Sequence, residues 1–77
     1  MKWVPVKSRM LAAVAYDRGW KQLYLKFRSG DVYCYWSVPG EAYQELLAAD
    51  SKGKYVRSHI LNRYRYQRIH SAVPTAS

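Results

Sequence analysis

An alternating run followed by a glycine turn constrains the fold of this chain more than any other feature. In "KQLYLKF", residues 21–27, three apolar side chains alternate with polar or amphipathic ones. This period of two is typical of a half-buried β-strand. The turn residues "RSG" follow, and residues 32–37 are rich in β-forming side chains. The sequence therefore predicts a β-hairpin built from these two strands.

The loop of this hairpin decides which side chains share a face, because a one-residue slip in register moves a whole set to the other surface. A two-residue loop, Ser29-Gly30, would place Tyr33 and Tyr35 outside, but such loops prefer Asn, Asp or Gly at their first position. A three-residue loop that starts at residue 28, with Gly30 in the left-handed conformation, pairs Tyr33 with Leu25. We favour this second loop, which makes both tyrosines mainly structural, with hydroxyls at the rim of the core.

On the same register, Trp36, Tyr24 and Lys26 lie on the opposite face of the hairpin. They would form an exposed aromatic and basic surface, and aromatic rings can stack on nucleic-acid bases.

The apolar segment at residues 11–16 predicts the preceding strand of an antiparallel meander. It ends at Asp17-Arg18-Gly19, where Gly19 can close a second three-residue loop. That loop would set Ala13 opposite Leu23 and put Leu11 on the same apolar face.

Beyond Pro39 the apolar period changes to that of a helix. Proline suits the first helical turn, and "EAYQELLAA", residues 41–49, predicts an amphipathic helix that packs on the sheet. Asp50 or Ser51 can cap a short second helix. The expected apolar faces are Ala42, Tyr43, Leu46 and Leu47 in the first helix and Tyr55, Val56, His59 and Ile60 in the second.

Alternation returns in "NRYRYQRI", residues 62–69, and predicts a fourth strand at a sheet edge. Tyr64 and Tyr66 lie on one side of it, and Arg63 and Arg65 on the other. The predicted fold is thus a single α+β domain over residues 1–70. Its small antiparallel β-meander has three strands plus the C-terminal fourth, packed against one amphipathic helix and a short second helix. Residues 71–77 are expected to be a flexible C-terminal tail.

The formal charge of +8 is concentrated in the last third of the chain. Residues 1–50 hold seven Lys or Arg and all five acids, whereas residues 51–77 hold six Lys or Arg and no acid. A field of one sign on part of a small domain attracts polyanions. The alternative role for such charges is a solubilising surface, or arginines that lie over tyrosines and cap helix carbonyls.

Few residues could support catalysis or metal binding. Cys34, His59 and His70 lack the paired spacing of a zinc site, and a single strand cysteine is usually inert packing. The glycines stand singly at turns, so no phosphate-cradling loop is present. We therefore expect no enzyme activity, no cofactor and no metal. One cysteine and no apolar run long enough for a membrane helix indicate a cytoplasmic protein with no membrane partner.

The chain resembles the KTSC domain family, named for its occurrence at the C-terminus of some lysyl-tRNA synthetases and also found as stand-alone bacterial proteins. The resemblance runs from about residue 6 to residue 69. It is carried by "AYD" at 15–17, "FRSGDVYCYWSVP" at 27–39, "LLAADSKGKY" at 46–55, and "IL" with "RYRYQRI" within 60–69. RNA binding is the role suggested for the family, and the resemblance gives no role to Trp20 or Trp36.

These observations lead to two hypotheses. The first is a small basic module that binds RNA, or another nucleic acid, through a Lys and Arg face with exposed aromatics. The second is a protein interaction or homodimerisation module that uses an edge strand and an aromatic patch. The candidate nucleic-acid-binding residues are Lys26, Trp36, Lys52, Lys54, Arg57, Arg63, Arg65 and Arg68. The candidate structural aromatic residues are Tyr33, Tyr35, Tyr64 and Tyr66.

Overall fold

A five-stranded antiparallel sheet forms one layer of the molecule, and helices form the other. The computed structural model describes residues 2–70, so the expected tail at residues 71–77 lies outside the described residues. The strands are β1 (Val4–Pro5), β2 (Leu11–Asp17), β3 (Gln22–Phe27), β4 (Val32–Tyr35) and β5 (Tyr66–His70). The helices are α1 (Gly40–Ala48), α2 (Lys52–Tyr55) and the π-helical turn η1 (Val56–Ile60).

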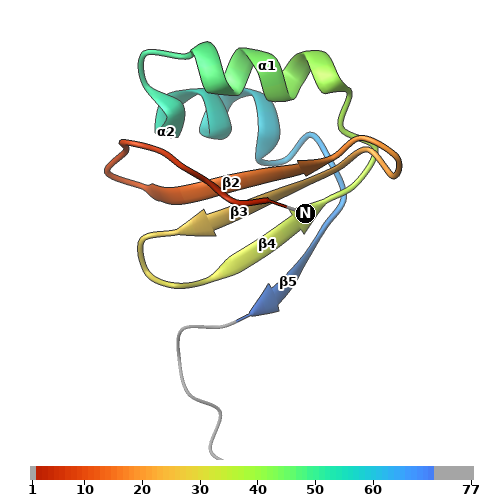
Figure 1. Cartoon of the computed structure of the whole chain (residues 1–77), viewed down its shortest axis with the longest axis horizontal. Helices are drawn as coiled ribbons and strands as arrows, with labels where there is room; N and C mark the ends of the chain where they lie inside the picture. The colour runs from red at the N-terminus through yellow and green to blue at the C-terminus, as the bar shows by residue number, and fades with distance from the viewer. Residues whose placement is uncertain (1, 71–77) are drawn as a thin grey trace, which may run out of the picture.

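The strands lie in the order β1-β2-β3-β4-β5, and the helices cover one face of the sheet (Figure 1). This arrangement confirms the predicted α+β class, with a meander joined by a C-terminal edge strand. It also adds a strand that the sequence did not predict. β1 has only two residues, one of them Pro5, and proline is confined to sheet edges because it cannot donate to the ladder.

The predicted register of the β3–β4 hairpin is confirmed. Leu23 pairs with Tyr35 and Leu25 pairs with Tyr33. Gly30 has a φ of 99°, in the left-handed region that the three-residue loop requires. Both tyrosines therefore lie on the helix-covered face with the leucines.

The predicted register of the β2–β3 hairpin is wrong. Val14, not Ala13, lies on the face of the leucines, because Tyr16 pairs with Leu23 and Val14 with Leu25. The Asp17 carboxylate accepts hydrogen bonds from the backbone N–H of residues 19 and 20, at 2.9 and 3.2 Å, which lengthens the loop. The positive φ of this turn, 54°, belongs to Lys21.

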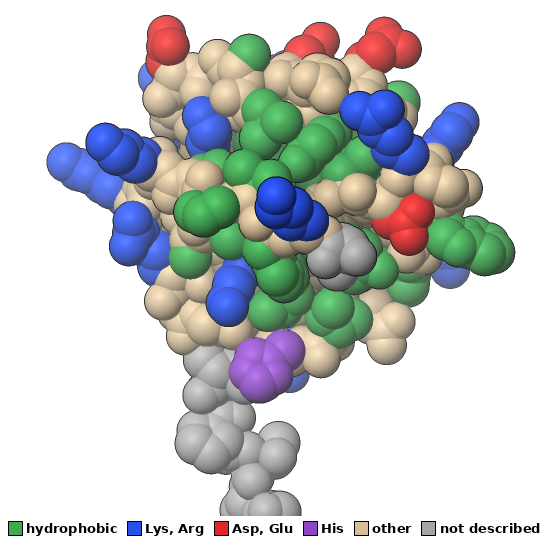
Figure 2. Space-filling model, viewed as in Figure 1, with side chains coloured by type: hydrophobic (Ala, Val, Ile, Leu, Met, Phe, Trp, Pro, Cys, Tyr) green, Lys and Arg blue, Asp and Glu red, His purple; other side chains and the backbone are tan. Residues whose placement is uncertain are grey.

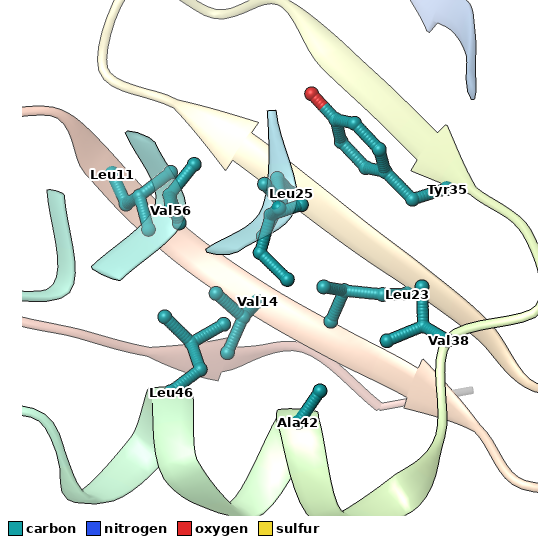
Figure 3. Close-up of a cluster of buried hydrophobic side chains, with 10 residues drawn as sticks. Leu11, Val14, Leu23, Leu25, Tyr35, Val38, Ala42, Leu46 and Val56 are labelled. Carbon is teal, nitrogen blue, oxygen red and sulfur yellow. The ribbon is translucent and has the colours of Figure 1, made fainter. Parts of the chain in front are cut away.

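The core lies between the sheet and the helices. Figure 3 shows Val14 and Leu23 from the strands beside Ala42 and Leu46 of α1. Complete burial of a leucine or valine side chain contributes about 1.5–3 kcal/mol. A β-bulge in β2 between Leu11 and Ala13 lets Leu11 join this core. The buried core residues are Leu11, Val14, Leu23, Leu25, Tyr35, Val38, Ala42, Leu46, Val56 and Ile60.

Both predicted helices form, with small differences at their ends. Pro39 is the N-cap residue of α1, and the predicted apolar face of this helix is buried or half-buried. Ser51 caps α2, where its hydroxyl accepts a hydrogen bond from the Lys54 N–H at 3.3 Å. The Tyr55 hydroxyl donates to the Glu45 carboxylate at 2.7 Å and so ties α2 to α1.

The last strand is shorter than predicted. It spans Tyr66–His70, whereas the alternating pattern predicted residues 62–69. Asn62 has a φ of 66°, and the Arg63 N–H donates to the Ile60 carbonyl at 3.2 Å, so residues 61–63 form a turn at the end of η1. Arg63 and Arg65 therefore both precede the strand, which carries only Arg68 of the three arginines in this segment.

Candidate functional site

The sheet face opposite the helices, called the open face below, has no helix over it within residues 2–70 (Figure 1). At its centre two small side chains flank a tyrosine. Ala15 pairs with Tyr24, and Tyr24 pairs with Cys34, so these three side chains form a row across β2, β3 and β4. Ala15 is fully buried and Cys34 is 4% exposed, although no helix covers them. Larger neighbours must therefore cover these two small side chains.

Three aromatic side chains provide this cover. Trp3, Tyr24 and Trp36 are all half-buried. The Trp3 and Tyr24 rings meet edge to face, with centroids 6.4 Å apart and planes at 78°. The Trp36 N–H donates to the Arg65 carbonyl at 2.9 Å, which extends the sheet beyond β4 and places these two residues opposite each other. The open face thus carries an aromatic layer whose outer surface is accessible.

Two cations lie next to this layer. The Lys26 ammonium stands 5.9 Å from the centre of the Trp3 ring, within the range of a cation–π interaction. Arg65 is exposed opposite Trp36. Figure 2 shows hydrophobic side chains in the middle of the visible surface, with Lys and Arg side chains over and around them. The predicted aromatic and basic surface of Tyr24, Lys26 and Trp36 therefore exists on one face.

The other predicted cations do not join this face. Lys52, Lys54 and Arg57 belong to the helical layer, and the Lys52 ammonium donates to the Ala49 carbonyl at 3.0 Å. Arg63 lies in the turn after η1, and Arg68 pairs with Tyr33 on the helix-covered face. Three of the eight predicted binding residues, Lys26, Trp36 and Arg65, share the open face, and the expectation of a single basic patch near the C-terminus does not hold. The cause is topological, since α2 and β5 lie in different layers.

Of the four predicted structural tyrosines, three pack in or against the core and one is exposed. Tyr35 is 2% exposed in the core, and Tyr33 and Tyr64 pack against the core while half-buried. Tyr66 lies on the predicted face, opposite Tyr35, but is 57% exposed. Figure 1 shows why, because no helix lies over β5. Tyr66 is therefore available for contact with a ligand.

A second candidate site, the tyrosine pocket, opens beside Tyr66 on the helix-covered face. It is a cavity of about 550 Å³ between the β3–β4 turn, the segment before β2 and the turn after η1. Sequence reasoning missed it, because its walls come from three segments that are far apart in the chain, within residues 9–10, 27–35 and 61–66. The tyrosine pocket is lined by Arg9, Met10, Phe27, Arg28, Ser29, Asp31, Tyr33, Tyr35, Leu61, Asn62 and Tyr66.

Four aromatic rings form one wall of the tyrosine pocket. The Tyr66 ring lies 5.6 Å from both the Tyr33 ring and the Tyr35 ring, and Phe27 meets Tyr33 edge to face at 5.5 Å. Burial raises the pKa of Tyr35 to about 12, and the neighbouring Tyr33 and Tyr66 add to the shift. Figure 3 shows its hydroxyl pointing away from Ala42 and Leu46. The hydroxyl is therefore neutral at physiological pH.

Cys34 and the histidines form no catalytic arrangement in the part of the chain that the structure describes. Burial raises the pKa of the Cys34 thiol, and the neighbouring Tyr24 opposes part of the shift. A buried neutral thiol is a poor nucleophile. His59 is exposed, and its ring stacks on Tyr55 with centroids 4.4 Å apart. Among residues 2–70, no three His, Cys, Asp or Glu side chains are placed to hold a metal ion.

The helices of the described region are also too short and too polar to cross a lipid bilayer.

Comparison with known proteins identifies the family. The family model of the KTSC domain matches residues 7–64. The chain belongs to the KTSC domain family. The crystal structure of a KTSC domain protein from Yersinia pestis superposes on it with a TM-score of 0.87 at 29% identity, covering 90% of this chain and 97% of that one. The KTSC resemblance expected from the sequence motifs is therefore confirmed.

Three relatives show the settings in which this KTSC domain occurs. An uncharacterised protein of Stutzerimonas stutzeri is 40% identical over 70 residues, which cover 90% of this chain and 99% of the relative. A protein of Tsukamurella paurometabola is 39% identical over 61 residues, which cover 79% of this chain and 91% of the relative. A lysine–tRNA ligase of Nostoc is 34% identical over 63 residues, which cover 82% of this chain but 11% of the ligase. The same domain thus makes up nearly all of two relatives and a small part of the third.

Proposed function

We propose that this KTSC domain is a non-enzymatic module that binds single-stranded RNA on its open face. The observation that carries the proposal is the accessible aromatic layer of Trp3, Tyr24 and Trp36 on a sheet surface without a helix. Unpaired bases stack on such rings, and each stacked base contributes about 1–3 kcal/mol. A four-stranded sheet with exposed aromatics binds RNA in this way in other modules.

The charges next to the layer support the same proposal. Lys26 and Arg65 stand at separate positions beside the rings, where they can reach phosphates on either side of a stacked base. A guanidinium also stacks on bases through its planar surface. The net charge of +8 adds long-range attraction for a polyanion, including that of the helical-layer cations that do not touch the strand.

The lysine–tRNA ligase relative gives independent support. Its name describes an enzyme that acts on tRNA, and it contains this domain within 11% of its length. A domain attached to such an enzyme is close to the tRNA on which the enzyme acts. We also propose a cytoplasmic location, since the single cysteine, Cys34, is a free thiol and RNA is found in that compartment.

Tryptophan fluorescence tests the proposal directly. The chain has three tryptophans. Trp20 is 76% exposed in the β2–β3 turn, so a Trp20→Phe background leaves only the two open-face indoles as reporters. Single-stranded RNA, single-stranded DNA and duplex RNA are then titrated at two salt concentrations. We expect quenching by single-stranded RNA, with log K falling by about 0.7 per phosphate for each tenfold rise in salt.

Matched variants locate the binding face. Trp36→Leu and Lys26→Ala should each weaken RNA binding, the first by about fivefold or more from the lost stacking. Lys54→Ala and Arg57→Ala remove the same kind of charge from the helical layer and should have much smaller effects. Amide spectra confirm that each variant remains folded. Equal losses from the two sets, or no binding at low salt, would refute the open face as the RNA site.

An edge strand supports a second candidate function, association with a protein strand. All five residues of β5 are exposed, and Ile69, 51% exposed, lies at a bulge. An exposed edge can pair with a strand of another chain, including a second copy of this domain. Light scattering over a hundredfold range of concentration tests this alternative. A molecular mass that doubles as the concentration rises would favour it, provided that the Ile69→Lys variant stays monomeric over the same range.

A further inference from the structure

The tyrosine pocket and the open face lie on opposite sides of the sheet. Tyr33 and Tyr35 project toward the helices, whereas Cys34 between them projects to the open face. A ligand in the pocket therefore cannot share these side chains with a strand on the open face. Any function of the pocket is additional to the function proposed above and does not depend on it.

The aromatic wall of the pocket suits a flat ring. Tyr66 is 57% exposed, yet its ring is held at 5.6 Å from two neighbouring tyrosine rings. An exposed ring that its neighbours hold in place offers stacking area with little entropy to lose on binding. Leu61, in the turn after η1, also lines the pocket. A planar heterocycle on Tyr66 would gain contact with several residues at once.

The rim of the pocket adds cations that can bind phosphate. The Arg28 backbone N–H donates to the Met10 carbonyl at 2.9 Å, and its Nε donates to the Ser8 carbonyl. These two bonds fix the side chain and leave the terminal guanidinium nitrogens to bind a ligand. Arg9 lines the same pocket and is exposed. Two guanidinium groups at one rim match the oxygens of a phosphate group.

The remaining polar groups limit the charge of the ligand. Asp31 lines the pocket, and its carboxylate accepts a hydrogen bond from the Ser29 hydroxyl at 3.3 Å. Two arginines and one aspartate leave a net charge of about +1, which matches a single phosphate better than a triphosphate chain. Carboxylate and amide groups, here those of Asp31 and Asn62, accept hydrogen bonds from base amino groups or ribose hydroxyls. The volume of about 550 Å³ lies within the usual range for small-molecule sites.

We infer that the tyrosine pocket binds a nucleoside monophosphate, with the base stacked on Tyr66 and the phosphate at Arg9 and Arg28. Two sources offer this same chemistry, a free nucleotide and the 5′-phosphorylated end of an RNA strand. Both present one base, one ribose and one terminal phosphate to the pocket.

Amide shift mapping by NMR with AMP, adenosine and inorganic phosphate tests this inference on the full chain. We expect AMP to shift amides of residues 27–31 and 61–66, and to bind at least about tenfold more tightly than adenosine or phosphate alone. A 5′-phosphorylated trinucleotide is compared with its 5′-hydroxyl form. Preference for the phosphorylated trinucleotide over AMP identifies an RNA end as the source, and the reverse identifies a free nucleotide.

Two pairs of variants separate the pocket from the open face. Tyr66→Ala should weaken AMP binding about fivefold or more, and Arg9→Gln should reduce the advantage of AMP over adenosine. Trp36→Leu and Arg18→Gln serve as controls, because neither residue lines the pocket, and both should bind AMP normally. Tyr66 and Arg9 are exposed, so their replacement should leave the fold intact. Absence of pocket shifts with AMP, or phosphate binding as tightly as AMP, would overturn the inference.

Discussion

Tyr16 and Tyr43 stack with their ring centroids 5.0 Å apart and their planes 13° apart, and this pair joins β2 to α1. The Tyr16 hydroxyl also donates to the Val38 carbonyl, just before the helix begins. One side chain thus holds both the start of α1 and its first turn against the sheet. The helix covers the core in this position and leaves β4 and β5 uncovered at the tyrosine pocket.

The Tyr16 hydroxyl should contribute to stability through its bond to Val38. Tyr16→Phe keeps the stacked ring but leaves this carbonyl without the hydroxyl, so the free energy of unfolding should fall by about 0.5–1.5 kcal/mol. Tyr16→Leu should cost about 0.5–1.5 kcal/mol more from the lost ring pair. Urea unfolding measures both values. If the two variants are equally stable, the ring stack does not hold the helix as described.

Gly30 should tolerate alanine poorly, because its φ of 99° is strained for any residue with a Cβ atom. Gly30→Ala should lower the free energy of unfolding by about 1–2 kcal/mol. Gly19→Ala is the matched control, since Gly19 is not in the positive-φ region and an added Cβ meets the Asp17 carboxylate at 3.4 Å, an ordinary contact. Equal losses in thermal unfolding would contradict the assignment of strain to residue 30.

Lys21, in the β2–β3 hairpin, tests the same kind of backbone strain by the opposite substitution, from a residue with a Cβ atom to glycine. Its φ of 54° is a conformation that glycine adopts without a Cβ penalty, and its carbonyl accepts a hydrogen bond from the Val38 N–H at 2.9 Å. Lys21→Gly should therefore raise the free energy of unfolding by up to about 1 kcal/mol. Lys26→Gly, in the middle of β3, should instead destabilise the protein. A loss of stability in the first variant would contradict the strain at Lys21.

The two hairpins show where sequence reasoning about the fold succeeds and where it fails. At Arg28-Ser29-Gly30 the glycine takes the left-handed position, so turn chemistry alone predicts the register. At Asp17 a side-chain carboxylate organises the loop, and Lys21 takes the positive φ that turn chemistry predicts for Gly19. A pattern of hydrophobic residues does not show the hydrogen bonds that an aspartate side chain makes to nearby backbone N–H groups.

For the candidate sites too, the sequence predicts local features correctly and misses those that depend on how distant segments pack. Strand alternation is a local property, and it correctly predicts the face on which Tyr24 and Lys26 lie. The C-terminal cations were expected on one surface, but α2 and β5 lie in different layers, and alternation says nothing about layers. The tyrosine pocket joins Arg9, Tyr33 and Asn62, which no local pattern connects. Such a site becomes visible only in three dimensions.

Cys34 should be protected from thiol reagents in the folded protein. Its side chain is 4% exposed beneath the aromatic layer, and burial raises the pKa of the thiol above its ordinary value. A disulfide reagent at pH 8 should modify native protein at least about a hundredfold more slowly than protein in 6 M urea. Trp3→Ala, which removes part of the aromatic layer, should accelerate the native reaction. Rapid modification of folded wild-type protein would show that the layer does not cover the row beneath it.

Stability should fall as the pH rises from about 10 to 12. The pKa of Tyr35 is about 12 in the folded protein, chiefly because of burial, against an ordinary value of 10.0. Below pH 10 the hydroxyl is neutral in both states, so it causes no change. Between these values the unfolded chain loses the proton that the folded protein retains, which favours unfolding.

The slope from this one group is at most about 1.4 kcal/mol per pH unit, and it should be smaller because Tyr35 also lines an open pocket. Urea unfolding of wild type and of Tyr35→Phe at intervals from pH 9 to 11.5 measures it. The variant keeps the ring but not the titrating hydroxyl, so its stability should fall less steeply, whereas Trp20→Phe should follow the wild type. Burial and the hydrogen bond to Glu45 also raise the pKa of Tyr55 to about 12. Tyr55 therefore leaves some dependence of stability on pH in all three proteins. Parallel curves for wild type and Tyr35→Phe would mean that water reaches the Tyr35 hydroxyl in the folded state.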